Sequence, residues 1–264
     1  LYYGASSFAK ALVLAMKGHQ PQDLSQSHGL ACATGDHDLI GNFTMRANGH
    51  GLFQEFNDVA APLNRLTYFD ETSLRTRAFP TAKSERLKKL KLRLIDCLAR
   101  SQYLGKSFEL CTGSEPKFIS LFFSKDSNEG VYTLQTDIPK IFDGRETLQQ
   151  IVEALRAKAP FLNQWRVREA MHAWDHTRII FDNLHPMPNE FEQLRESHDA
   201  FESAPTPGAN KVDPFESMPP LAGGRDSWTA YIEPVDGEHL SEYSLMLAGL
   251  LGFSSLVRYH PHTW

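Results

Sequence analysis

The triplet Asp36-His37-Asp38 places two carboxylates beside an imidazole, a combination that could bind a metal ion. His28 and His50 are close enough in sequence to fold toward it. The spacing matches no defined metal-binding motif, and neighbouring residues of a strand point to opposite faces, so only a loop could let the triplet ligate together. We therefore interpret the triplet as a polar turn, and we expect neither a metal nor a cofactor.

Patterns typical of covalent catalysis or nucleotide hydrolysis do not occur. The sequence has no G-x-S-x-G elbow and no G-x-G-x-x-G loop, and Gly223-Gly224 is not followed by the Lys-Ser or Lys-Thr of a phosphate loop. Cys97 falls at an apolar helical position, as a structural thiol does. Cys32, Cys97 and Cys111 lack paired spacing, which predicts reduced thiols. The sequence alone does not decide whether the protein is an enzyme.

A basic segment spans residues 83 to 93, where six bases and one acid give a local charge of +5. Leucines at helical spacing follow and overlap it, which predicts a basic segment leading into a helix. Such a segment could contact the phosphates of a nucleic acid. The alternative is a solvated helix face. The candidate contacts are Lys88, Lys89, Lys91 and Arg93.

Hydrophobic periodicity predicts both helices and strands, so we expect an α+β fold. The predicted elements are a helix over 2–17 ended by Gly18, a mostly irregular stretch to residue 51, a hairpin of strands 118–123 and 130–134, a helix over 145–158 ended by Pro160, strands at 177–181 and 228–232, a proline-rich connection over 186–220 and a buried helix over 241–259.

The composition is that of an ordinary globular protein. Of 264 residues, 41% are hydrophobic and 22% charged, and the formal charge of −5 gives no general attraction to nucleic acid or to an anionic membrane. No apolar run is long enough to span a bilayer. We expect a cytoplasmic protein of a single domain over 1–264, with a helical core from 1–104 and 241–264 and an α+β insertion over 105–240.

Three segments carry a resemblance to a known family. Residues 2–12 together with Lys17-Gly18 and His28-Gly29-Leu30 resemble the opening of the YaaC-like family of bacterial proteins, and residues 256–261 with Trp264 are similar to its later R-Y-x-P-x-x-W segment. Members continue beyond that tryptophan, so the resemblance implies a further C-terminal helical portion. It implies no particular activity.

The first of these segments is also similar to the helical HEPN superfamily, whose ribonucleases pair an arginine with a histidine that is separated from it by four to six intervening residues. Such a pair could stabilise phosphate charge and move a proton. Arg166 with His172 and Arg178 with His185 have this spacing. A chain with this many arginines and histidines contains about as many such pairs by chance, so the spacing alone does not identify a ribonuclease.

We therefore hold three hypotheses. The first is a regulatory module that binds nucleotide, nucleic acid or a protein partner in a cleft between the helical core and the insertion, through His28, Arg258 and His260. The second is a metal-independent ribonuclease like those of the HEPN superfamily. The third is a structural subunit of a larger complex, with the acidic, proline-rich connection as a docking strap. For His28 the structural alternative is a loop cap before Gly29, and for Arg258 it is a residue favoured by the helix dipole. The oligomeric state is open.

Overall fold

Both helices and strands are present in the computed structural model of the chain, so the α+β prediction is confirmed. The residues that the structure describes are 2–32, 42–70, 73–79, 81–88, 90–126, 131–139, 147–172, 176–184, 218, 221–223 and 228–259.

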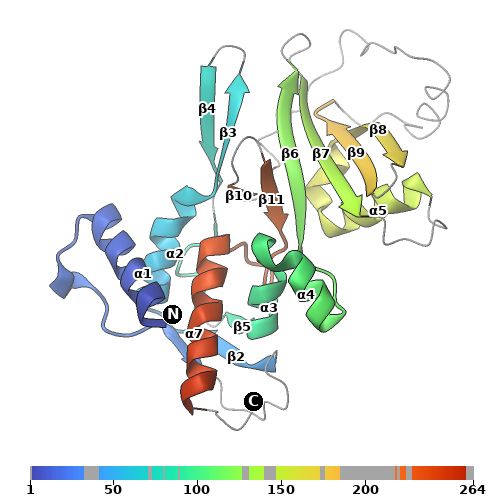
Figure 1. Cartoon of the computed structure of the whole chain (residues 1–264). Coiled ribbons are helices and arrows are strands. Elements are labelled where there is room, and N and C mark those ends of the chain that lie inside the picture. Colours follow the sequence, from blue (N-terminus) through green and yellow to red (C-terminus); the bar gives the residue numbers. More distant parts are fainter. Residues whose placement is uncertain are drawn as a thin grey trace, which may run out of the picture.

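Helices lie at both ends of the described chain and between its strands (Figure 1). The α-helices are α1 (Tyr2–Lys17), α2 (Leu52–Ala60), α3 (Leu94–Ala99), α4 (Gly105–Thr112), α5 (Leu148–Lys158) and α7 (Glu242–Tyr259). The short 3-10 helices are η1 (Pro21–Asp23), η3 (Ala61–Leu63), η4 (Gln102–Leu104) and η5 (Pro160–Gln164).

The described strands form three antiparallel sheets. A three-stranded sheet has the order β1-β2-β5, a hairpin pairs β3 with β4, and a larger sheet has the order β10-β11-β6-β7-β9-β8. The strands are β1 (Leu30–Cys32), β2 (Thr44–Ala47), β3 (Arg65–Asp70), β4 (Ser73–Ala78), β5 (Lys91–Arg93), β6 (Phe118–Asp126), β7 (Val131–Pro139), β8 (Arg166–His172), β9 (His176–Asp182), β10 (Leu221–Gly223) and β11 (Trp228–Ile232).

The first of two hydrophobic cores joins the two ends of the described chain. Helix α7 lies between α1 and α2 on one side and α3 on the other (Figure 1), and it also contacts β1 and β2. Burial of apolar side chains from all these elements holds them together. The largest of them include Phe43, Phe53, Leu92, Leu94, Leu245 and Leu251.

The second core lies between the larger sheet and α5 with η5. Thr147 caps α5, because its hydroxyl accepts a hydrogen bond from the Gln150 amide at 3.2 Å, and Pro160 follows the helix end. Leu66, on β3, and Phe79, which follows β4, belong to this second core. The division of the chain into a core of 1–104 and 241–264 and an insertion of 105–240 stays a prediction.

The long elements agree with their predictions. The helices expected at 2–17, 145–158 and 241–259 are α1, α5 and α7, and the expected strands are β6, β7, β9 and β11. In α1, Ala9 and Val13 are fully buried, and Gly18 follows with a φ of 64° in the left-handed region that ends a helix. The proline-rich connection lies outside the described residues apart from Met218.

Two predictions need correction. The part of the core expected to be helical, residues 1–104, also contains β1 to β5, because strands of three to six residues carry too little alternation to stand out. The helix over 241–259 is not buried on every side, since Tyr243, Met246 and Val257 are 41%, 41% and 58% exposed.

Candidate functional site

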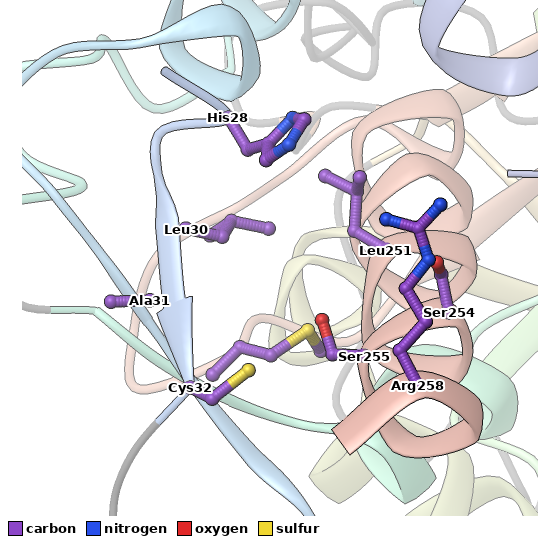
Figure 2. Close-up of a pocket in the computed structure, with 9 residues that line it drawn as sticks. His28, Leu30, Ala31, Cys32, Leu251, Ser254, Ser255 and Arg258 are labelled. Carbon is purple, nitrogen blue, oxygen red and sulfur yellow. The ribbon is translucent and has the colours of Figure 1, made fainter. Parts of the chain in front are cut away.

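A small pocket of about 80 Å³ lies between β1 and the C-terminal half of α7 (Figure 2). Strand β1 forms one wall, with His28 just before it and Cys32 at its end. Helix α7 forms the other wall with Leu251, Ser254 and Arg258. We call this the His28–Arg258 pocket. Its nine lining residues are His28, Leu30, Ala31, Cys32, Met45, Leu251, Ser254, Ser255 and Arg258.

The start of α2 holds the segment that carries His28. The Phe53 amide donates to the His28 carbonyl at 3.0 Å, and the Leu52 amide donates to the Ser27 carbonyl at 2.9 Å. These are first-turn amides, which have no acceptor within their own helix. The segment therefore satisfies the helix end, and the helix end fixes the backbone of His28.

Two glycines allow this close approach. A Cβ on Gly51 would lie 2.3 Å from the Cα of Gly29, and Gly51 has a φ of 139° that favours glycine. Gln54, which is 3% exposed, donates from Nε2 to the Gly29 carbonyl at 3.0 Å and to the Asn48 carbonyl at 2.7 Å. The His28-Gly29 segment thus packs directly against the N-terminal end of α2.

Arg258 comes from the last turn of α7, where the helix dipole favours a cation. Its guanidinium donates to the Tyr3 hydroxyl and lies 5.0 Å from the centre of the Tyr3 ring. This contact joins α1 to α7. In Figure 2 the Arg258 side chain extends along α7 beside Ser254.

The pocket combines groups that bind an oxyanion. A guanidinium, an imidazole and two serine hydroxyls can all donate hydrogen bonds to phosphate or carboxylate oxygens, and none of the nine lining residues is acidic. Within the described ranges, no three His, Cys, Asp or Glu residues come together to hold a metal ion. The triplet Asp36-His37-Asp38 lies outside those ranges.

Two of the three predicted ligand-binding residues, His28 and Arg258, line this one pocket, whereas His260 lies outside the described residues. This pocket does not lie in a cleft between the helical core and the insertion, because its lining residues belong to 28–32, to Met45 and to 251–258, and none belongs to 105–240. Sequence reasoning missed Ser254 and Ser255. The available signal was two adjacent serines one turn before Arg258, in the largely apolar part of the helix that follows Ser244.

The predicted nucleic-acid contacts lie elsewhere. Lys91 and Arg93 are on β5 and line a second hollow, and Lys88 is exposed in the turn before β5. The alternative of a solvated helix face is therefore wrong for Lys91 and Arg93. Lys89 lies outside the described residues.

The two arginines of the ribonuclease-like pairs form ion pairs within the larger sheet. Arg166 pairs with the buried Asp182 at 2.5 Å, and Arg178 pairs with Asp137 at 2.9 Å, which lowers the pKa of Asp137. His172 lies at the other end of β8 from Arg166, roughly 20 Å away at ~3.3 Å per residue. These two residues cannot act on one phosphate. His185 is outside the described residues.

Comparison with known protein families shows to which family the chain belongs. A family model described as YaaC-like Protein matches residues 1–264. The chain belongs to the YaaC-like family. Neither a comparison with curated proteins nor one with solved structures yields a match.

The segments on which the YaaC-like resemblance rests meet in space. Tyr3 in the first segment contacts Arg258 in the last, and His28 and Leu30 in the middle one line the same pocket as Arg258. The pocket is thus made where the three family-like segments come together. Among the described helices of this YaaC-like chain, none has both the length and the apolar character needed to cross a bilayer.

Proposed function

We propose that this YaaC-like chain is a regulatory binding module that recognises the phosphate group of a nucleotide in the His28–Arg258 pocket. One observation carries the proposal: Arg258, His28 and two serines line a single hollow, and none of its nine described lining residues is acidic. A positive side chain with convergent donors favours a phosphate over a neutral ligand.

The size of the pocket limits what enters it. Pockets that enclose a whole small molecule occupy roughly 300–1,000 Å³, whereas this one has about 80 Å³. A single phosphate-sized group fits this space, and the nucleoside part would stay outside. Binding would also draw β1 and α7 together, which is how a ligand could act on the rest of the core.

Cys32 provides a direct test, because it lines the pocket and is exposed. Cys111, exposed on α4, is the matched control outside the pocket. The alkylation rate of each thiol would be measured with adenosine and guanosine phosphates and with inorganic phosphate. We expect nucleotides to slow the reaction of Cys32 and to leave that of Cys111 unchanged.

Two variants make the result specific. Arg258→Ala should abolish the protection of Cys32, whereas Arg168→Ala, at an exposed arginine of β8, should leave it intact. Ser255→Ala, which keeps the contact of Arg258 with Tyr3, should weaken it. Circular dichroism would confirm that each variant is folded. Equal Cys32 rates with and without every nucleotide would refute the proposal.

The ribonuclease alternative has one supporting observation, since His28 and Arg258 could transfer a proton and stabilise a phosphate from the same pocket. It predicts cleavage of RNA in excess chelator that is lost in a folded His28→Ala variant. A subunit of a complex would instead show a stable protein partner and no nucleotide protection of Cys32.

A further inference from the structure

The solvent-facing side of the three-stranded sheet is basic. Along β2, Met45 and Ala47 point into the first core while Thr44 and Arg46 point outward, and along β5 Leu92 is buried between exposed Lys91 and Arg93. This alternation places three cations on one face. We call Thr44, Arg46, Lys91 and Arg93 the basic face.

Two of these cations face each other directly. Arg46 and Lys91 are register partners in the antiparallel pair of β2 and β5, and like charges in that position destabilise a sheet. In the part of the chain that the structure describes, neither side chain has a hydrogen bond or an ion pair. Since neither cation is paired with a described acidic residue, a bound anion would relieve the repulsion between Arg46 and Lys91.

The basic face continues into a groove of about 440 Å³ at the junction of the first core and the larger sheet. Lys117 stands just before β6, and Asp236 in the turn after β11 lies on the same groove. The groove residues are Thr44, Lys91, Arg93, Asp96, Arg100, Lys117, Pro234, Val235 and Asp236.

Pairing inside the groove leaves its lysines available. Asp96 accepts two hydrogen bonds from Arg93, at 2.7 and 3.0 Å, and lies 3.5 Å from Arg100. Burial raises the pKa of Asp96, but Arg93, Arg100 and the charge of Lys117 together lower it. Arg100 also donates to the carbonyls of Glu233 and Pro234. The Lys117 side chain has no hydrogen bond or ion pair to any described residue.

The local charge is opposite to that of the whole chain. Five cations against two carboxylates give the basic face and groove together a formal charge of +3, whereas the chain carries −5. Such a patch attracts a polyanion locally. The cations are Arg46, Lys91, Arg93, Arg100 and Lys117, and the carboxylates are Asp96 and Asp236.

We propose that the basic face and groove bind the phosphodiester backbone of single-stranded nucleic acid. A row of cations that enters a concave groove suits a narrow, flexible polyanion. None of the nine described residues that line the groove is aromatic, so contacts go to the backbone and binding is independent of sequence. A membrane surface is disfavoured, because no large exposed apolar side chain belongs to β1, β2, β5 or the groove lining.

This site is distinct from the proposed nucleotide pocket. Met45 lines the His28–Arg258 pocket, whereas its neighbour Thr44 lines the groove on the other side of the sheet. Protection of Cys32 reports on the pocket, and oligonucleotide binding reports on the basic face. The two experiments therefore show separately whether the pocket proposal or the basic-face proposal has failed.

The test measures binding of a fluorescent oligouridylate and of an oligothymidylate, each about 12 nucleotides long, within the ~4–16 nucleotides typical of such sites. Lys91→Glu puts a carboxylate opposite Arg46, so this variant should keep the urea midpoint of the original protein or exceed it. We expect it to bind both oligonucleotides at least about tenfold more weakly at low salt.

Salt dependence tests the charge count. Arg46→Gln should reduce the slope of log affinity against log salt by about 0.7, the value for one phosphate contact on a single strand. Lys17→Gln, at an exposed lysine of α1, should bind as the original protein does. The proposal is overturned by no oligonucleotide binding at low salt, by full affinity in folded Lys91→Glu, or by tighter binding to anionic vesicles than to oligonucleotides.

Discussion

Asn57 is expected to be the most sensitive polar residue of the first core. It is fully buried on α2, donates from Nδ2 to the Ala82 carbonyl at 2.9 Å and accepts at Oδ1 from the Ser244 hydroxyl at 3.0 Å. Ser244, in the first turn of α7, lies 2.8 Å from the hydroxyl of Ser241. The amide of one side chain thus connects α2, α7 and the chain near residue 82.

The cost of Asn57→Ala follows from the groups it leaves behind. The Ala82 carbonyl loses a buried donor, which costs about 1–3 kcal/mol, and the Ser244 hydroxyl loses an acceptor but can rotate, which costs about 0.5–1.5 kcal/mol. We expect a loss of roughly 2–4 kcal/mol in the free energy of unfolding. Ser244→Ala should cost about 1–3 kcal/mol, because it leaves the Asn57 oxygen without a donor and the buried Ser241 hydroxyl without its acceptor.

Urea unfolding of the two single variants and the double variant measures these values. Because both single variants remove the Asn57–Ser244 bond, the double variant should cost about 1 kcal/mol less than the sum of the singles. Asn163→Ala, at an exposed asparagine of η5, is the matched control and should stay within about 0.5 kcal/mol of the original.

The reasoning is refuted if Asn57→Ala costs less than about 1 kcal/mol with an unchanged slope against urea, since a buried carbonyl left without a donor cannot be that inexpensive. Strict additivity of the two substitutions would refute the direct bond between the side chains.

Three further predictions concern single side chains. Burial raises the pKa of Glu242 although Gln102 donates two hydrogen bonds to it, so the stability that the neutral carboxyl group contributes is lost as pH rises. Glu242→Gln should therefore raise the urea midpoint near neutral pH, and this gain should vanish below pH 4.5. A difference in urea midpoint that stays the same at every pH would count against this view. Burial raises the pKa of Cys97 to about 12, so an alkylating reagent should modify Cys32 in the folded protein and spare Cys97, and equal rates would contradict this. Gly51→Ala should lower the free energy of unfolding by at least about 2 kcal/mol, and an unchanged midpoint would show that the glycine contact is not tight.

The sequence predicts elements well where a periodic pattern is long. Helices α1, α5 and α7 and the β6–β7 hairpin each extend over enough residues for burial of one face to be visible in the order of apolar residues. Strands β1, β2 and β5 have only three or four residues, and β5 comes from far along the chain to pair with β2. The formation of β1 and β2 depends on packing against α7, and the local sequence of the strands does not reveal that packing.

The site is predictable only as separate residues. His28 and Arg258 stand out in sequence, but their common pocket depends on contacts of α7 with β1 and α1 that close over most of the chain. The opposition of Arg46 and Lys91 likewise depends on the register of β2 with β5. Whether these residues bind ligands stays a prediction.

The position of α7 has a consequence for the order in which the molecule is built during synthesis. Asn57 and Ser244 are 187 residues apart, and Tyr3 and Arg258 are 255 apart, so the first core cannot close until the ribosome has released almost all of the described chain. The pairs β6–β7 and β8–β9 join strands close in sequence and can assemble earlier. Until α7 emerges, the apolar faces of α1 and α2 remain uncovered on the nascent chain, and the His28–Arg258 pocket does not exist. Ligand recognition there is therefore confined to molecules whose synthesis has passed α7.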